Sequence, residues 1–318
     1  MNILVTGGAG FIGSALARRL ADEGHQVIVV DNFNEYYDVN LKRARQRELL
    51  AGIEVIEGDI SNKNDLYELF ANHDFDVVCH LAAQAGVRYS VEHPEVYVNT
   101  NVVGTQYLFE TMKDFGVKRM VYASTSSAYG ISSTSPFKED EKADRPVSMY
   151  AVTKRAGELM AHMYYSMYGI ESTCLRFFTV YGPWSRPDMA MLKFAEKMMA
   201  GEVIDIYNNG DLRRDFTYID DIVDGFVKAV EKPLGYEIIN LGNGKPVELI
   251  DFVTSLEQVL GVEAKKNMME MQSGDVYETF ADTTKAKELL GFESQTDFHE
   301  GIKKFAEWFV EYQKSSKI

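Results

Sequence analysis

The sequence is poor in cysteine, in proline and in positive charge. Its 318 residues include only two cysteines, Cys79 and Cys174, and both lie in apolar runs where a buried free thiol is expected in place of a disulfide. The 33 basic and 48 acidic side chains give a formal net charge of −15, which leaves no basic face for a nucleic-acid backbone. These shortages predict a cytoplasmic protein that does not bind nucleic acid.

Long apolar runs are also missing from the sequence. None approaches the roughly 20 residues needed to cross a bilayer, so no membrane partner is expected. Met1 leads directly into a strand-like segment, without a cationic or cleavable leader. The six histidines are scattered and show no metal-ligand spacing, so no metal site is expected either.

Short apolar runs, at 3–5, 27–30, 55–56, 77–78, 120–122 and 173–175, alternate with amphipathic segments. This alternation predicts an α/β fold with a doubly wound parallel sheet of the Rossmann type, formed by residues 1–177. The later part mixes helices, at 189–200 and 249–260, with short strands such as 237–240. It predicts a second, smaller α/β substrate-binding lobe at 178–318, interwoven with the first because residues 215–235 return to the sheet.

Two segments predicted to be helical, 101–115 and 151–168, carry long apolar stripes. Packing on the protein's own sheet would cover most of these side chains, but both stripes are long enough to share a second face with another subunit. A homodimer is therefore expected. The stripes consist of Val102, Tyr107, Leu108, Met112, Leu159, Met160, Met163, Tyr164 and Met167.

Glycines at 7, 10 and 13 separate the first predicted strand from a helix-forming segment. A tight turn, close approach of backbone to a pyrophosphate and close helix packing each require a residue without a side chain. The helix start offers unpaired N–H groups and a positive dipole end to a diphosphate. Because strand, glycines and helix occur in this order, a dinucleotide site is favoured over structural glycines. Its candidate residues are Gly7, Gly10, Phe11, Ile12 and Gly13.

Acidic residues follow the second and third predicted strands. Asp31 lies 18 residues after Gly13, where a carboxylate would accept hydrogen bonds from the adenosine ribose and repel a 2′-phosphate, so NAD is favoured over NADP. The alternative is that Asp31 only caps a turn with Asn32. Asp59 and Ile60 close the third strand and are candidates for the adenine site, although a solvated loop aspartate is the alternative. Asn32 and, later in the chain, Tyr150 and Lys154 are further candidates for contacts with the cofactor.

Tyr150 and Lys154 lie four residues apart at the start of a predicted helix, so their side chains share one face. A tyrosine is a poor base at neutral pH, but a neighbouring ammonium and a cationic nicotinamide favour its phenolate. This pair alone is common and usually exposed. Behind a dinucleotide motif and the hydroxyl-rich segment 123–127, it indicates a catalytic pair.

On these motifs the chain resembles the extended short-chain dehydrogenase/reductase family and, within it, the nucleotide-sugar 4-epimerases, from Asn2 to about Phe309. The resemblance implies that Tyr150 takes the proton of the sugar 4-OH while a hydride passes from C4 to NAD. It also implies that Thr125 hydrogen-bonds the same oxygen, with Ser126 and Ser127 beside it. NAD is then regenerated in place, and the net reaction is redox-neutral.

Ser127 departs from the pattern of the related dehydratases and UDP-glucuronate decarboxylases, which usually carry a glutamate at this position. Elimination then lacks its acid/base, and the 4-keto intermediate is expected to rotate and take the hydride back on its other face. Decarboxylation is therefore the less favoured reading. An NAD-binding regulator without chemistry is least favoured, because Tyr150 and Lys154 are both present.

Three stretches, 31–38, 82–88 and 176–190, are similar to UDP-glucuronate 4-epimerases, and Thr179 stands where galactose epimerases generally have asparagine. A C6 carboxylate needs donors, and the guanidinium fork of Arg186 or Arg88 can pair both oxygens. A structural or diphosphate contact is the alternative for either arginine. Candidate hydroxyl donors are Thr125, Ser126, Ser127 and Thr179. A 4-epimerase of UDP-glucose or UDP-N-acetylglucosamine is the alternative function.

The UDP half of the expected substrate is assigned by the same resemblance. The segment 210–221 matches the part of the family in which an arginine contacts the diphosphate, and that residue is Arg214. Asp275 matches a residue that holds the uridine ribose. Gln272 stands where galactose epimerases often have arginine, so a second ionic contact is not expected.

Overall fold

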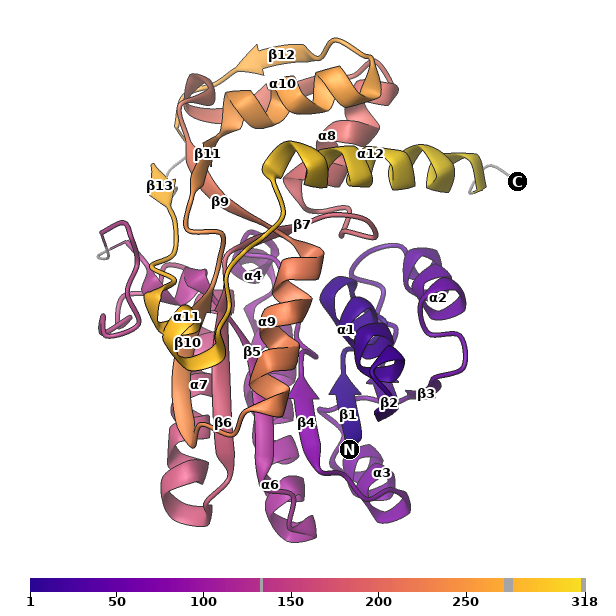
Figure 1. The fold of residues 1–318 in the computed structure, drawn as a ribbon, viewed down its shortest axis with the longest axis vertical. Coiled ribbons are helices and arrows are strands. Elements are labelled where there is room, and N and C mark those ends of the chain that lie inside the picture. The colour runs from indigo at the N-terminus through magenta and orange to yellow at the C-terminus, as the bar shows by residue number, and fades with distance from the viewer. Residues whose placement is uncertain (132–133, 272–276, 316–318) are drawn as a thin grey trace.

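The computed structural model describes residues 1–131, 134–271 and 277–315, and its centre is one large parallel sheet (Figure 1). The strands of this sheet are β1 (Asn2–Thr6), β2 (Gln26–Asp31), β3 (Glu54–Glu57), β4 (Val77–His80), β5 (Arg119–Thr125), β6 (Glu171–Phe177) and β10 (Tyr236–Leu241). They lie in the order β10-β6-β5-β4-β1-β2-β3, and all neighbours are parallel. The predicted doubly wound α/β fold is confirmed.

Helices cover both faces of the large sheet, as the alternation of side chains in β1 requires. Ile3 and Val5 lie in one core with α1 (Phe11–Asp22) and α9 (Ile219–Glu231). Leu4 points to the other face and lies in a second core. The helices over that second core are α3 (Lys63–Asn72), α6 (Thr105–Phe115) and α7 (Met149–Tyr168).

The predicted helix at 101–115 is divided in two. Its first turns belong to a π-helix, η1 (Val98–Gly104), and the α-helical part, α6, begins at Thr105. A wider turn of this kind often occurs at functional sites, because it displaces the side chains of one turn. Two short helices, α4 (Tyr89–Glu92) and α5 (Pro94–Tyr97), precede it, and α2 (Val39–Glu48) follows β2.

The assignment of residues 237–240 to the smaller lobe is wrong. These residues belong to β10, which pairs with β6 at the edge of the large sheet, with Ile239 beside Leu175. Helix α9 packs on α1 and β5 and brings the chain back to this edge. Residues 215–235 were expected to return to the large sheet. Helix α9 returns to it, whereas the preceding strand β9 (Arg213–Tyr218) lies in a separate small sheet.

The second lobe lies above the carboxyl ends of the parallel strands (Figure 1). Its four-stranded sheet contains β9 with β7 (Thr179–Tyr181), β11 (Pro246–Glu248) and β13 (Glu278–Thr279), and a two-stranded sheet pairs β8 (Val203–Ile206) with β12 (Lys265–Met268). The helices of this lobe are α8 (Ala190–Met199), α10 (Leu249–Leu260) and α12 (Phe298–Ser315). Helix α11 (Thr284–Leu290), expected in the second lobe, instead packs on β10 and α9 at the edge of the large sheet (Figure 1). The predicted helices at 189–200 and 249–260 are α8 and α10. One apolar core extends from β1 into this lobe through Phe216 and Phe252.

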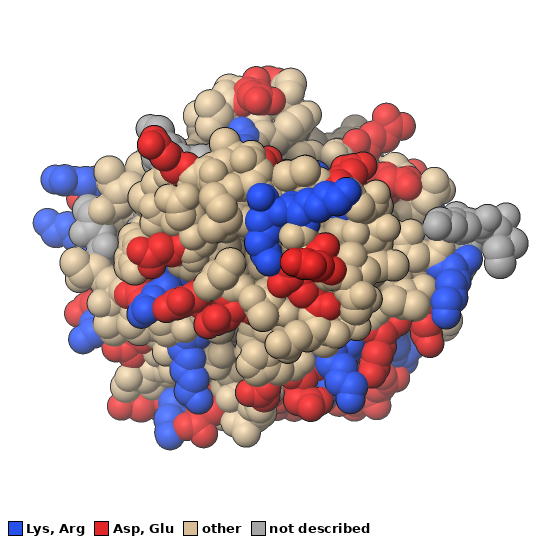
Figure 2. All heavy atoms as spheres, turned by 90° about the horizontal axis from the view of Figure 1, so that it is seen from above, with Lys and Arg blue, Asp and Glu red and all other residues tan. Residues whose placement is uncertain are grey.

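The surface carries charges of both signs. On the face drawn in Figure 2, basic side chains lie among acidic ones. Within the described ranges, no helix is long and apolar enough to cross a membrane.

Candidate active site

One pocket opens at the carboxyl ends of the large sheet, beside the point where the strand order reverses between β4 and β1. This is where open α/β sheets bind ligands, because loops diverge there and leave a crevice. The pocket brings together most of the predicted cofactor and catalytic residues. These are Gly7, Gly10, Phe11, Ile12, Gly13, Asp31, Asn32, Asp59, Ile60, Thr125, Tyr150, Lys154 and Arg186.

The glycine loop has no room for side chains. Gly7 has φ +69°, and a Cβ there would lie 2.7 Å from the Cα of Ala82. A Cβ on Gly13 would lie 2.3 Å from the carbonyl oxygen of Gly7. Helix α1 begins at Phe11 without a side-chain cap, so its first N–H groups face the pocket edge unpaired by a capping residue. The loop therefore fits a diphosphate and explains the predicted glycine spacing.

Asp31 is buried at the end of β2 and is held by the loops around it. Its Oδ2 accepts the N–H of Ala9 at 3.0 Å, and its Oδ1 accepts the N–H of Phe33 at 2.9 Å. Burial raises the pKa of Asp31, and the positive charge of Lys42 opposes that rise. Asp31 thus does hold the local turn, but it also lines the pocket, where a ribose can use the remaining lone pairs of its carboxylate.

Lys42 is a pocket residue that the sequence analysis did not identify. Its ammonium donates to the backbone oxygen of Asn34 at 2.7 Å and to the side-chain oxygen of Asn34 at 2.9 Å. Burial lowers the pKa of Lys42. In the sequence it lies in a highly charged helix, where a lysine is normally exposed, so only the tertiary packing reveals its place.

The end of the pocket that was predicted to hold adenine is formed by Asp59 and its neighbours. Asn32 donates from Nδ2 to Oδ2 of Asp59 at 2.9 Å, which ties the loop after β2 to the loop after β3. The Oδ1 of Asp59 accepts two hydrogen bonds from Ser61. Asn32 therefore orients Asp59 and does not pair with Asp31.

The proposed catalytic residues meet at the other end of the pocket. Thr125 ends β5, and Tyr150 lies in the first turn of α7, which Ser148 caps by accepting the N–H of Ala151 at 3.1 Å. Thr125 and Tyr150 both line this end of the pocket, where the hydroxyl of Thr125 lowers the pKa of Tyr150. Lys154 lies one turn farther along α7 and is 2% exposed. The structure therefore brings Thr125, Tyr150 and Lys154 together, as predicted.

Burial dominates the ionisation of this group. It raises the pKa of Tyr150, against the opposing effects of Arg186 and Thr125, and it lowers the pKa of Lys154 to about 7. The ammonium of Lys154 lies 4.2 Å from the centroid of the Tyr122 ring. The arrangement can move a proton to or from an oxygen bound beside Thr125 and Tyr150.

Three predicted hydroxyl donors adjoin the pocket without lining it. Ser126 and Ser127 begin the 3-10 helix η2 (Ser126–Tyr129), and the N–H of Ser127 donates to Oγ1 of Thr125 at 3.2 Å. Thr179 begins β7 between Phe178 and Val180, which are lining residues.

The two candidate arginines occupy different places. Arg186 lines the pocket and forms a bidentate ion pair with Asp188. Arg88 is exposed outside the lining residues, with its guanidinium carbon 5.5 Å from the centroid of the Tyr207 ring. Of the two, only Arg186 shares the pocket with Tyr150.

Of the two predicted UDP contacts, Arg214 lies beyond the pocket lining. Arg214 is part of β9, and its Nη1 donates to the backbone oxygens of Arg213 at 2.9 Å and Tyr277 at 3.1 Å. Asp275, like Gln272, lies outside the described residues.

Asn101, in the π-helix η1, is a further residue that the sequence analysis missed. Its Oδ1 accepts the N–H of Gln84 at 2.7 Å, and its Nδ2 donates to the oxygen of Gln84 and to Oγ1 of Thr153, each at 3.0 Å. Asn101 thereby attaches the pocket loop after β4 to α7. A buried amide with every contact satisfied fixes one loop conformation. The sequence offered one indication of this role: Asn101 is a polar residue at the start of an otherwise apolar helical segment.

Among the residues that the structure describes, no group of three or more His, Cys, Asp or Glu side chains is arranged to hold a metal ion. The pocket instead offers backbone N–H groups, hydroxyls and two buried amines, those of Lys42 and Lys154. This donor set suits a dinucleotide and a sugar oxygen.

Comparison with known proteins agrees with this geometry. Residues 3–242 match the model of the NAD dependent epimerase/dehydratase family. The chain is 45% identical over 335 residues to UDP-glucuronate 4-epimerase 3 of Arabidopsis thaliana, covering 99% of this chain and 78% of the plant protein. A crystal structure of UDP-glucuronic acid 4-epimerase from Bacillus cereus, in complex with UDP-glucuronic acid and NAD, superposes with a TM-score of 0.90 at 36% identity, over 98% and 100% of the two chains. UDP-glucose 4-epimerase of Thermotoga maritima, with UDP-glucose, gives the same TM-score at 34% identity and the same coverage.

Proposed function

The chain belongs to the NAD dependent epimerase/dehydratase family, and we propose that it inverts C4 of UDP-glucuronate to give UDP-galacturonate. The observation that carries this proposal is the position of Arg186, a cation in the same pocket as Tyr150 and Lys154. Similarity over nearly all of this chain to proteins named UDP-glucuronate 4-epimerases, from Arabidopsis thaliana and Bacillus cereus, supports the choice of substrate.

The glycine loop and Asp31 would hold NAD, with its adenine near Asp59 and Ile60. Bound there, NAD supplies a hydride acceptor that also returns the hydride. Tyr150 takes the proton of the sugar 4-OH, and Thr125 hydrogen-bonds the same oxygen and keeps it beside the phenol. Lys154 in its charged form stabilises the phenolate of Tyr150. The proton goes back to the oxygen when C4 is reduced, so Tyr150 is restored at the end of each cycle.

Inversion requires that the 4-keto sugar turn in the pocket before it is reduced. Ser127 supports this course over elimination, because a serine at this position is no acid/base for removing a ring proton. The keto acid is also prone to lose CO2, since its carboxylate is β to the carbonyl. We propose that hydroxyl donors, Thr125 and Thr179 among them, keep the carboxylate near the ring plane, where the breaking bond overlaps poorly with the carbonyl π system.

Arg186 is well prepared to receive the C6 carboxylate. Its Nε and one N–H of Nη2 are occupied by Asp188, which fixes the plane of the guanidinium. Nη1 and the second N–H of Nη2 lie on the other edge, and this edge can pair both carboxylate oxygens. For the UDP half we propose Arg214 at the diphosphate and Asp275 at the uridine ribose. Ser126 and Ser127 are proposed as further hydroxyl donors to the carboxylate, and Arg88 is proposed in its alternative role, as a diphosphate contact.

The nearest alternative is the same chemistry on UDP-glucose or UDP-N-acetylglucosamine. The fold does not decide between them, because the Thermotoga maritima UDP-glucose 4-epimerase superposes equally well. Arg186 favours the acid. A decarboxylase is disfavoured by Ser127, and a regulator without chemistry is disfavoured by the presence of both Tyr150 and Lys154 in the pocket.

We also propose a homodimer formed through α7 and α6. Val152, Leu159, Met163 and Met167 project from one side of α7, and Leu159 and Met167 are 56% and 68% exposed. Four exposed apolar side chains at helical spacing are costly in water and typical of a subunit contact. A cytoplasmic location is proposed with it, supported by the two buried free thiols, Cys79 and Cys174.

The test of the proposed function is incubation of the purified protein with UDP-glucuronate without added NAD, followed by anion exchange and proton NMR. UDP-galacturonate formed without net NADH is the expected result. UDP-pentose with CO2 would make the protein a decarboxylase. Absence of turnover after NAD addition, with turnover of UDP-glucose, would assign the neutral substrate.

A further inference from the structure

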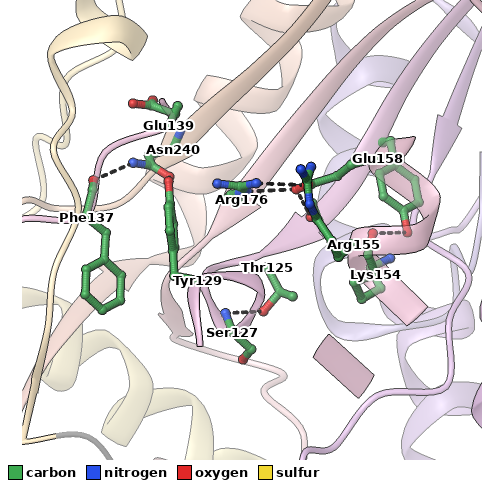
Figure 3. A network of polar contacts seen from close by, with 12 residues as sticks. Thr125, Ser127, Tyr129, Phe137, Glu139, Lys154, Arg155, Glu158, Arg176 and Asn240 are labelled. Carbon is green, nitrogen blue, oxygen red and sulfur yellow. Dashed lines mark hydrogen bonds and ion pairs between the residues drawn. The ribbon is translucent and has the colours of Figure 1, made fainter. Parts of the chain in front are cut away.

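A buried carboxylate, Glu158, lies behind the candidate catalytic residues and binds three side chains (Figure 3). It is 0% exposed. Its Oε1 accepts Nε of Arg176 at 2.8 Å and Oγ of Ser124 at 2.6 Å, and its Oε2 accepts Nη2 of Arg176 at 2.8 Å and Nη1 of Arg155 at 2.7 Å. Both oxygens are therefore fully engaged.

These bonds join the two elements that meet at the reaction site. Ser124 is the neighbour of Thr125 at the end of β5, while Glu158 lies one helical turn beyond Lys154 on α7. The hydroxyl of Tyr122, also on β5, donates to the backbone oxygen of Lys154 at 3.3 Å. A shift of α7 along β5 would break these contacts and separate Tyr150 from Thr125.

Packing alone does not account for this ion pair. Desolvation of a buried pair costs as much as, or more than, its attraction returns, and apolar residues of similar volume are often equally stable. Nη1 of Arg176 has no hydrogen-bond acceptor among the described residues, and the guanidinium lies 4.4 Å from the centroid of the Tyr129 ring. The hydroxyl of Tyr129 continues the network to Oδ1 of Asn240 on β10, at 2.7 Å.

We propose that Glu158 is a positioning residue for the reaction: it fixes α7 against the end of β5 and places a carboxylate one helical turn from Lys154. The inference rests on the proposed function in one respect, since Tyr150, Thr125 and Lys154 are the groups that it positions. Arg176 serves to hold Glu158 in place and ionised.

The charges around Lys154 support this role. Glu158 faces it from α7, the thiol of Cys174 from β6, the ring of Tyr122 from β5 and the imidazole of His80 from β4. Burial lowers the pKa of Lys154 to about 7, and the carboxylate of Glu158 opposes this fall. Burial also keeps Cys174 and Tyr122 protonated, because it raises the pKa of both groups. Glu158 is thus the group on this side that brings a full negative charge.

Glu158→Gln tests the proposal because it keeps the shape and removes the charge. With the carboxylate gone, the pKa of Lys154 should fall by about one unit, so the alkaline limb of the kcat profile should move to lower pH by the same amount. At pH 8, kcat should fall about tenfold while KM for the nucleotide sugar stays within about twofold. Glu158→Asp, which retains the charge, should recover the pH profile at a reduced kcat.

A matched control is Glu110→Gln. Glu110 lies on α6 and accepts a hydrogen bond from the hydroxyl of Tyr164, which belongs to α7 as Glu158 does. Neither Glu110 nor Tyr164 lines the pocket. Glu110→Gln should leave the pH profile unchanged. Should Glu158→Gln fold poorly, the double variant Glu158→Gln/Arg176→Met removes both members of the ion pair, and it should regain stability while keeping the displaced alkaline limb.

The pKa of Lys154 can also be read without substrate, by NMR titration of its Cε–Hε signal, assigned through its loss in Lys154→Met. A lower pKa in Glu158→Gln supports the inference even if UDP-glucuronate is not the substrate, so the two proposals fail separately. A folded Glu158→Gln variant with an unchanged Lys154 titration overturns the inference, whether or not its kcat falls.

Discussion

Arg186 and Asp188 face each other through two parallel hydrogen bonds, Nε to Oδ1 at 2.9 Å and Nη2 to Oδ2 at 2.8 Å. The hydroxyl of Tyr36 donates to the same Oδ2 at 3.2 Å. Tyr36 belongs to the loop that starts at Asp31, so the proposed cofactor loop contacts the counterion of the proposed carboxylate-binding arginine. This pairing holds the guanidinium edge that remains for a ligand in one orientation.

Arg186→Ala should therefore lower kcat/KM for UDP-glucuronate far more than kcat/KM for UDP-glucose. Loss of a charge-assisted bidentate contact should lower kcat/KM for UDP-glucuronate by about 100-fold or more. The loss for UDP-glucose should stay below about fivefold, because it lacks the carboxylate. Steady-state kinetics with both substrates measure the two ratios.

Arg88→Ala is the matched control for this prediction. Arg88 is exposed and lies against Tyr207, away from the pocket lining, so its removal should change the two substrates alike. Equal losses on both substrates in Arg186→Ala would remove the carboxylate role.

Local sequence signals predicted the parts of the fold and the site that depend on local geometry. The glycines at 7 and 13 could be predicted because the backbone itself excludes a Cβ there. Tyr150 and Lys154 follow from helical spacing. The strand at 237–240 was placed in the wrong lobe, because a short apolar run reads the same in any sheet, and its partner β6 lies about 60 residues earlier.

Residues that act through tertiary contacts could not be predicted in this way. Lys154 and Glu158, four apart on a helix, read as an ordinary exposed ion pair, whereas α7 buries both beneath β5 and β6. The choice between Arg88 and Arg186 likewise depends on which loop closes the pocket. Lys42 lies in a charged helix, and only its packing against the loop at Asn34 reveals it.

Thr179→Ala should release the decarboxylation that the enzyme suppresses. Without its hydroxyl the carboxylate is freer to leave the ring plane, so the ratio of UDP-pentose to UDP-galacturonate should rise. Proton NMR and mass spectrometry of the products measure this ratio independently of the overall rate. If neither Thr179→Ala nor Thr125→Ala raises the pentose fraction, the hydroxyl donors do not provide the protection.

Asp31→Asn should weaken the binding of NAD and strengthen the binding of NADP. The amide keeps the size of the side chain but loses the charge that accepts from the ribose and repels a 2′-phosphate. NAD affinity should fall about tenfold, in keeping with a charge-assisted hydrogen bond, and NADP affinity should rise. Calorimetric titration of NAD-free protein measures both. Asp38→Asn, in the cap of α2 on the same loop, should leave the NAD/NADP ratio unchanged.

The double variant Leu159→Lys/Met163→Lys should convert the proposed homodimer to a monomer. Both side chains lie on the exposed apolar side of α7, and two ammonium groups there would have to be desolvated in a subunit contact. Size exclusion with light scattering gives the mass. Met199→Lys, on α8, is the control and should leave the mass unchanged. A wild-type protein that is monomeric at micromolar concentration would contradict the proposal.

Lys154→Met should stabilise the NAD-free protein while it abolishes activity. Burial lowers the pKa of Lys154 to about 7 in the folded chain, against an ordinary value of 10.5. Between these two pH values the unfolded chain binds a proton that the folded chain does not, so the wild type gains stability as the pH rises through this window. Methionine fills a similar volume without a proton to lose.

The advantage of Lys154→Met should therefore be greatest at pH 7 and below, and should shrink as the pH approaches 10.5. At pH 8 it should amount to about 1–3 kcal/mol in the free energy of unfolding. Urea unfolding of both proteins at several pH values measures the difference. Two results would contradict the prediction: a difference in the free energy of unfolding that does not change with pH, or a variant less stable than the wild type at pH 8. Either result would mean that burial of Lys154 does not destabilise the folded protein. The expected result would instead show that the site keeps a destabilising amine because Tyr150 needs it.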